Sequence, residues 1–157
     1  MSVKDRPSSI PWPPIIFAAI IVIGYALQHF FALPWALPPT SDLLSFFGVF
    51  FIGGAIALDI ATVSTLWRAH TTIWPNRRAD HLVTSGPFSV SRNPIYLGYV
   101  VVLFGLGLMF GNLWYFALAI VCGALLQHFA IRREEAHLQA RFPAAFLAYK
   151  RKVRRWI

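Results

Sequence analysis

Apolar residues dominate four stretches of the chain, and polar or charged residues separate these stretches. The stretches run from Ile15 to about Leu33, from about Leu43 to Leu66, from Pro94 to about Phe110 and from about Leu113 to Ile131. Each is close to the roughly 20 residues that a helix needs to cross a bilayer. We therefore expect an all-α integral membrane bundle with about four transmembrane helices.

The last two stretches form the most informative pattern. The 39 residues between Arg92 and Arg132 include no Asp, Glu, Lys or Arg, which is enough for two crossings, and hydrophobicity drops at Gly111-Asn112. A helical hairpin with arms of about 27 Å would return the chain to its starting level. We therefore expect Arg92 and Asn93 to lie beside Arg132–Glu135 at one membrane boundary. The alternative is that these residues only flank the helices as interfacial anchors.

These patterns predict a single domain, 1–157, with four parts. Residues 1–66 hold two spans, 67–93 form a polar connecting loop, 94–131 form the hairpin, and 132–157 form C-terminal helices. Three prolines end the first span because proline breaks the helical hydrogen-bond ladder, and Thr40-Ser41-Asp42 predicts the start of the second. The prolines are Pro34, Pro38 and Pro39.

The C-terminal segment predicts an amphipathic helix at the membrane interface. Its apolar residues recur at a spacing of three or four, and basic residues cover the other face. Pro143 divides the segment into two helices, since proline is well placed at a first helical position. The apolar positions are Leu138, Phe142, Phe146, Tyr149, Val153 and Trp156.

The second stretch has two unusual features. The first is Asp59, which is a functional candidate because a charged side chain is costly inside a membrane span. The alternative is that Asp59, only nine residues before Arg68, lies near the end of the span and caps or pairs locally. The second is a predicted face of small residues, which would let helices approach closely in lipid. This face comprises Gly48, Gly53, Gly54, Ala55 and Ala57.

The composition of the chain predicts a membrane protein. It is 57% hydrophobic and 13% charged, too apolar for a soluble protein of this size. All 14 Lys and Arg lie before the first span, in 67–92 or after residue 131, so four spans put these segments on one side. The positive-inside rule makes that side cytoplasmic, and we expect a bacterial inner membrane. The net charge of +8 then favours anionic lipid as a partner rather than nucleic acid.

Metal chemistry is not predicted. Cys122 is the one cysteine and lies within an apolar stretch, and the five histidines form no H-E-x-x-H or clustered motif. We expect no metal site.

Two motifs flank the hairpin and carry a family resemblance. The first reads L-V-T-S-G-P-F-x-x-x-R-N-P-x-Y-x-G, and the second reads E-E-x-x-L-x-x-x-F-x-x-x-F-x-x-Y. Their order around a hairpin, over roughly residues 77–157, resembles the isoprenylcysteine carboxyl methyltransferase and phospholipid methyltransferase superfamily. The resemblance implies an integral membrane enzyme that uses S-adenosylmethionine.

The chemistry of this cofactor independently favours the charged residues of the hairpin. A planar guanidinium suits its carboxylate and an acid suits its ammonium, so Arg92 with Glu134 or Glu135 are candidates. The two glutamates point about 100° apart on a helix, so only one is expected to contact the cofactor directly. The resemblance implies a wider cofactor-binding set. That set is His81, Leu82, Val83, Gly86, Arg92, Asn93, Pro94, Tyr96, Gly98, Glu134 and Glu135.

We expect Arg92 and Glu135 to act in catalysis, with Glu135 or His81 as the base if the acceptor is an amine or thiol. The acceptor would be lipid-like or small and apolar: an isoprenylcysteine carboxylate, a phospholipid amine or a thiol. Asn93 stands where carboxyl methyltransferases usually have His, and Ala130 where they often have Arg, which disfavours a prenylcysteine substrate. The alternatives are an NADPH-dependent sterol or lipid reductase and a non-enzymatic membrane assembly subunit.

Overall fold

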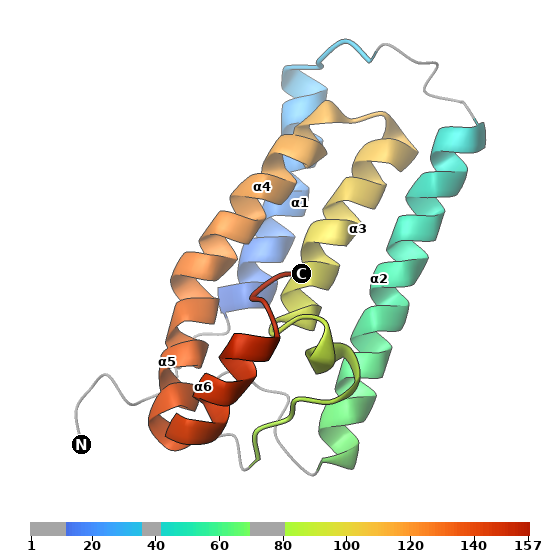
Figure 1. Ribbon diagram of the computed structural model, residues 1–157. Helices are drawn as coiled ribbons and strands as arrows, with labels where there is room; N and C mark the ends of the chain where they lie inside the picture. The colour runs from blue at the N-terminus through green and yellow to red at the C-terminus, as the bar shows by residue number, and fades with distance from the viewer. Residues whose placement is uncertain (1–11, 36–41, 70–80) are drawn as a thin grey trace.

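The computed structural model describes residues 12–35, 42–69 and 81–157, and within them the chain is helical and has no strand (Figure 1). The long helices stand side by side, and the shorter C-terminal helices gather at one end of the bundle. The elements are α1 (Trp12–Phe30), α2 (Asp42–Arg68), the 3-10 turn η2 (Gly86–Ser89), α3 (Pro94–Phe110), α4 (Leu113–Leu126), the π-helical turn η3 (Gln127–Ile131), α5 (Arg132–Arg141) and α6 (Pro143–Lys152).

Three helices are long and apolar enough to cross a membrane: α1, α2 and the continuous helix Leu113–Arg141 that α4, η3 and α5 form. The apolar part of that third helix ends at Ile131, so the charged residues of α5 lie beyond it. α3 is also apolar but has only 17 residues. The chain is thus an all-helical membrane bundle in which three of the expected four spans have full length.

The helix boundaries differ from the predicted ones at the first span. α1 begins at Trp12, three residues before the expected start, and ends at Phe30. Pro13 and Pro14 are tolerated because the first turn of a helix has no internal partner for its N–H groups. α2 extends the second span to Arg68. Thr40 and Ser41 of the expected helix start lie outside the described residues.

The hairpin turn forms where the drop in hydrophobicity predicts it. Gly111 ends α3 in the left-handed conformation, at φ 59°, which glycine adopts without strain. The side chain of Asn112 then begins α4 by accepting a hydrogen bond from the N–H of Trp114, at 3.0 Å. Its Nδ2 donates to the carbonyl of Gly24 at 3.1 Å, which ties the turn to α1.

Glycines bring α2 and α3 into close contact. A Cβ atom built on Gly48 would lie 2.8 Å from the carbonyl oxygen of Gly105, so neither position has room for a side chain. Ala55 is buried in the same interface. Gly53 and Gly54, by contrast, are exposed and have nothing within 4 Å of a built Cβ. The predicted small-residue face is therefore real at Gly48 and Ala55 but wrong at Gly53, Gly54 and Ala57, which point outwards.

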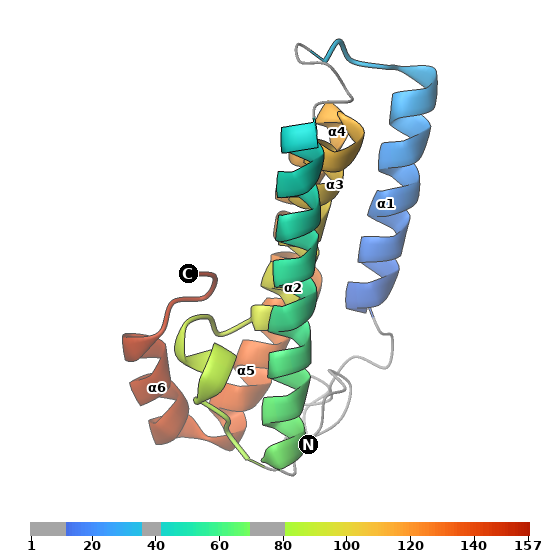
Figure 2. The same cartoon turned by 90° about the vertical axis from the view of Figure 1, so that its right-hand side faces the viewer.

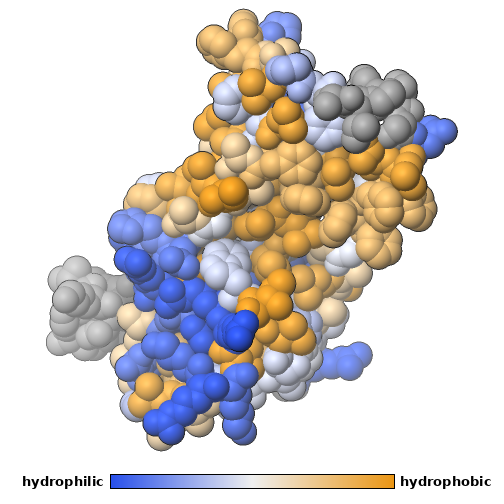
Figure 3. Space-filling view, turned by 45° about the horizontal axis from the view of Figure 1, so that its top comes forward, coloured by the Kyte–Doolittle hydropathy of each residue, from blue (hydrophilic) through white to orange (hydrophobic). Residues whose placement is uncertain are grey.

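The C-terminal helices break at Phe142 and Pro143, as expected. Phe146, Tyr149 and Val153 form a second small core with Leu82 and Phe88 of the connecting loop. Basic residues of α6 are exposed beside this core, and polar residues cover the corresponding end of the molecule in Figure 3, whereas apolar residues cover the other end. The two views in Figures 1 and 2 place α6 beside the 81–93 segment rather than along the bundle.

The last apolar residue of the predicted face behaves differently. α6 ends at Lys152 and Val153 is extended, so Trp156 does not continue the helical face. The chain instead turns back to the bundle, where Trp156 packs against the main core. Its Nε1 lies 3.3 Å from Oε1 of Gln127, to which it donates a hydrogen bond.

Candidate functional site at the charged end of the hairpin

The charged end of the hairpin comprises Arg92–Asn93 before α3 and Arg132–Glu135 at the start of α5. Its two halves meet directly. Nη2 of Arg92 lies 2.9 Å from Oε1 of Glu135, and Nε lies 3.2 Å from the same oxygen. The two side chains are only 8% and 10% exposed. The equal-arm hairpin thus places these residues together as the sequence predicts.

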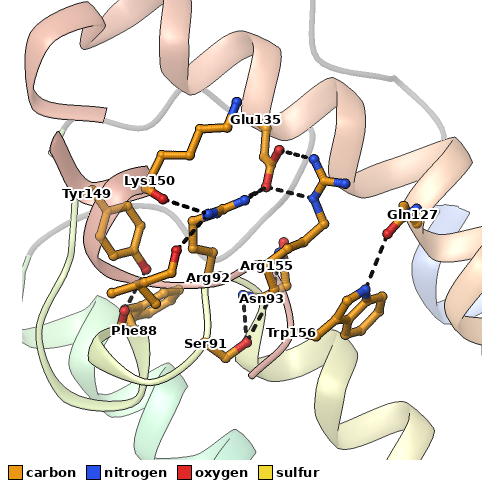
Figure 4. A network of polar contacts seen from close by, with 11 residues as sticks. Phe88, Ser91, Arg92, Asn93, Gln127, Glu135, Tyr149, Lys150, Arg155 and Trp156 are labelled. Carbon is orange, nitrogen blue, oxygen red and sulfur yellow. Dashed lines mark hydrogen bonds and ion pairs between the residues drawn. The ribbon is translucent and has the colours of Figure 1, made fainter. Parts of the chain in front are cut away.

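A third charged residue, Arg155, joins this pair from the C-terminal tail. Its Nη2 lies 2.7 Å from Oε2 of Glu135 and its Nε lies 3.1 Å from Oε1, so Glu135 accepts hydrogen bonds from two arginines (Figure 4). We call Arg92, Glu135 and Arg155 the charged triad. Sequence reasoning missed Arg155 because it lies in a run of basic residues that resembles a membrane anchor.

Backbone carbonyls at the end of α6 and in the tail that follows it, residues 153–157, also bind Arg92. Its Nη1 donates to Val153 at 2.7 Å and to Lys150 at 3.4 Å. The neighbouring Asn93 donates from Nδ2 to the carbonyl of Arg155 at 2.9 Å. The tail therefore lies across the residues that begin α3 and is held there by main-chain and side-chain contacts (Figure 4).

The triad fixes the charge of Glu135. Burial alone would raise the pKa of its carboxyl group, but hydrogen bonds from Arg155 and Arg92 and their positive charges hold the pKa below its usual range. The same contact raises the pKa of Arg155. Glu135 is therefore a carboxylate with both oxygens engaged, which suits a structural role better than that of a proton acceptor.

The two arginines keep different numbers of free donors. A guanidinium has five N–H groups, and Arg92 uses four of them on Glu135, Val153 and Lys150. Arg155 uses two, both on Glu135, among the residues that the structure describes, and its side chain is 31% exposed. Arg155 is therefore the better placed of the two to bind a further anion.

Glu134 lies apart from the triad. Its Oε1 accepts a hydrogen bond from the hydroxyl of Tyr96, and burial raises the pKa of its carboxyl group to about 7. Three residues further along α5, Nε2 of His137 is buried without a hydrogen-bond partner in the described part of the chain. The adjacent glutamates thus face different surroundings, as their 100° separation predicts, and Glu134 is the one with capacity left for a ligand.

The connecting loop borders a groove next to the triad. Tyr149 of α6 donates a hydrogen bond to the carbonyl of Phe88 at 2.6 Å, and burial raises the pKa of this hydroxyl to about 12. The groove between loop and helix has a volume of about 550 Å³. It is lined by Leu82, Thr84, Ser89, Ala145, Ala148, Tyr149, Lys152 and Val153.

The remaining predicted site residues are more dispersed. His81 is exposed on the loop, Val83 is half-buried, and Pro94 is buried at the start of α3. The glycines contact α2 instead of a free space: a Cβ on Gly86 would lie 2.9 Å from Oγ1 of Thr65, and a Cβ on Gly98 would lie 2.6 Å from Oδ1 of Asp59. At both glycines it is therefore α2 that approaches the backbone closely.

Comparison with known proteins gives one family. The profile of the family described as "Phospholipid methyltransferase" matches residues 43–145, which include α2, the connecting loop, the hairpin and α5. This range begins well before the motifs around the hairpin and ends before Arg155.

Two curated relatives carry names linked to metal resistance. The chain is 35% identical over 100 residues to the cobalt-zinc-cadmium resistance protein CzcN of Cupriavidus metallidurans, covering 64% of this chain and 45% of that protein. It is 34% identical over 90 residues to the nickel-cobalt-cadmium resistance protein NccN of Alcaligenes xylosoxydans xylosoxydans, covering 57% and 41%. The chain thus spans less than half the length of either relative. No solved structure matches.

Proposed function

The chain belongs to the phospholipid methyltransferase family, part of the isoprenylcysteine carboxyl methyltransferase superfamily, and on this premise we propose that it uses S-adenosylmethionine. Its role would be to methylate a lipid-like or small apolar acceptor within the membrane. The contact between Arg92 and Glu135 carries the proposal, because it joins the two sequence motifs into one site.

The described residues fit the groups that this cofactor presents. Its amino-acid end has a carboxylate and an ammonium, and the site offers Arg155 with unused donors and Glu134 with unused acceptor capacity. The groove beside the triad supplies hydroxyls at Thr84 and Ser89 and the ring of Tyr149. We propose that these residues, together with the predicted set around Leu82, Val83 and Asn93, hold the cofactor.

Bound S-adenosylmethionine would supply an electrophilic methyl group. The protein would contribute position and exclusion of water rather than a covalent intermediate. In this proposal Arg92 and Glu135 hold the starts of α3 and α5 together, so these two residues act by positioning, whereas Arg155 also binds the carboxylate of the cofactor. Glu134 binds the ammonium, which assigns direct contact to one of the two adjacent glutamates and leaves Glu135 with its two arginines.

Calorimetry on detergent-purified protein tests the proposal. We expect S-adenosylmethionine to bind, and Glu134→Gln and Arg155→Met to weaken its affinity about tenfold each, as for loss of a charged hydrogen bond. Arg133→Met is the matched control, because Arg133 is exposed on the same helix turn. Absence of binding by the wild-type protein, or thermal stabilisation by NADPH alone, would overturn the proposal in favour of a reductase-like or non-enzymatic protein.

The names of CzcN and NccN favour a second, compatible role in tolerance of divalent transition metals. We propose that such a role would operate through methylation of a membrane component. Growth of a deletion strain in nickel, cobalt and cadmium salts tests this role. The strain is complemented either with the wild-type gene or with the Glu134→Gln variant, and the two levels of rescue are compared. Equal rescue by both would separate metal tolerance from methyl transfer.

We further propose that the charged end of the hairpin faces the cytoplasm, where S-adenosylmethionine is made available to the site. The segregation of the 14 basic residues supports this orientation. Anionic lipid headgroups would then pair with the exposed basic residues of α6.

A further inference from the structure

Asp59 is a carboxylic acid in the interior of α2, and its side chain forms no hydrogen bond or ion pair with the residues that the structure describes. Its side chain lies against Gly98 of α3, where a Cβ atom would be only 2.6 Å from Oδ1 and 3.1 Å from Cγ. Oδ1 is buried and forms no hydrogen bond with any residue that the structure describes. Within the described part of the chain, the local cap or pairing that its sequence position suggests is therefore not seen.

Other polar side chains of α2 form hydrogen bonds within the helix itself. The hydroxyls of Thr62 and Thr65 donate to carbonyls one turn earlier in α2, each at 2.7 Å. A carboxylate cannot donate such a bond, so Asp59 has no equivalent contact. An ionisable group inside an apolar span is costly unless a partner offsets the cost, which makes a ligand the natural candidate.

The position of Asp59 relates it to the charged end of the hairpin. Gly98 follows Asn93 by five residues, a rise of roughly 7.5 Å along α3. Tyr96 lies between Asn93 and Gly98 along α3, and Tyr99 directly follows Gly98. The ring centroids of the two tyrosines are 6.3 Å apart, and the hydroxyl of Tyr96 donates a hydrogen bond to Glu134. Asp59 is only partly covered, so an apolar molecule lying along α2 and α3 would bring its polar head to the carboxyl group just below the cofactor site.

We propose that Asp59 is a membrane-side subsite that accepts a hydrogen bond from the proton-bearing head of the methyl acceptor. This inference rests on the proposed function and narrows its substrate class. A carboxylate in an apolar setting attracts an ammonium or hydroxyl head and repels a second carboxylate. The acceptor is therefore an amine or another hydrogen-bond donor rather than a carboxylate such as an isoprenylcysteine.

Ligand-induced thermal stabilisation tests the subsite without requiring turnover. Purified protein in a neutral maltoside detergent is titrated with dodecylamine or dodecanoate, in the presence and absence of S-adenosylmethionine. We expect dodecylamine to raise the melting temperature of the wild-type protein, with an apparent affinity about tenfold weaker in Asp59→Asn, and dodecanoate to have no effect. Asp42→Asn is the matched control, because Asp42 is an exposed acid at the other end of α2.

Equal responses of wild-type and Asp59→Asn to dodecylamine, or equal stabilisation by dodecanoate, would overturn the subsite. Asp59→Ser is a second variant in case the first is poorly folded. Calorimetry of cofactor binding keeps the two hypotheses apart, because Asp59→Asn should bind S-adenosylmethionine within twofold of wild type. Loss of cofactor binding in the wild-type protein defeats the proposed function, whereas a normal cofactor affinity with no amine selectivity defeats only the subsite.

Discussion

The guanidinium of Arg92 lies 2.9 Å from the carboxylate of Glu135, although 43 residues separate the two in sequence. The contact exists because two helices of nearly equal length lead away from one membrane boundary and return to it. Both side chains are almost fully buried, so the pair depends on its mutual neutralisation and on Arg155.

Arg92→Met should destabilise the protein by about 3 kcal/mol, because it leaves the buried Glu135 with a single cationic partner and frees two tail carbonyls. Arg155→Met should cost less, since Arg155 is partly exposed. Thermal melting in detergent, followed by tryptophan fluorescence, measures both. Melting temperatures for Arg92→Met that match those of the control Arg133→Met would contradict a structural role for the triad.

The triad also predicts how stability depends on pH. The pKa of Glu135 is lower in the folded protein than in the unfolded chain, so the folded state binds fewer protons at this site. Its contribution is fully present above the ordinary carboxyl pKa and is lost as pH falls through the lowered folded value. Melting temperature should therefore fall on acidification below about pH 4.5. The Glu135→Gln variant should have a lower melting temperature than the wild type at neutral pH, and it should lack the part of the acid-induced decrease that Glu135 causes. If the melting temperatures of the two proteins fall in parallel with pH, Glu135 is not the group responsible.

Cofactor affinity should depend on pH through a different residue. Burial raises the pKa of Glu134 to about 7, and only its carboxylate form can pair with the ammonium of the cofactor. The affinity for S-adenosylmethionine should therefore increase between about pH 6 and pH 7.5. Calorimetry at several pH values measures this, and Glu134→Gln should show weak, nearly constant affinity. A wild-type affinity that does not change across this range would count against Glu134 as the ligand.

Two glycines of α2 give a matched pair of packing variants. Gly48→Ala should cost about 1–3 kcal/mol, because its Cβ would lie 2.8 Å from the backbone of α3. Gly53→Ala should be neutral or slightly stabilising, since nothing lies within 4 Å of its Cβ. Melting temperatures of the two variants decide the point, and similar losses in both would mean that α2 packs through a different face.

Membrane orientation can be measured with introduced cysteines. Cys122 is buried, so the background reaction with a membrane-impermeant thiol reagent should be low. We expect Arg151→Cys on α6 to react only after the cells are permeabilised, and Ala32→Cys beyond α1 to react in intact spheroplasts, since both positions are exposed. The reverse pattern would place the charged end of the hairpin outside.

The hairpin and its charged end could be predicted because they depend on local properties of the sequence. An uncharged run of known length, interrupted by Gly111-Asn112, determines where the chain turns and which residues meet again. The break at Pro143 has the same local origin.

Arg155 and the Asp59–Gly98 contact could not be predicted in this way, because they depend on how separate segments pack. The basic residues near the C-terminus look alike in sequence. Only the turn after Lys152 directs Arg155 to Glu135, while the other basic residues of this run stay exposed. Similarly, glycines along α2 look equivalent, and packing against α3 buries Gly48 but leaves Gly53 on the surface.

The order of synthesis has a consequence for the charged triad. All the long helices leave the ribosome before residues 153–155 do, yet the carbonyl of Val153 and the side chain of Arg155 are needed to neutralise and hold Arg92 and Glu135. A nascent chain can therefore insert into the membrane while its site is still unassembled. Completion of the tail is then the last step of assembly, so premature termination within α6 would yield an inserted protein in which Arg92 and Glu135 lack these contacts.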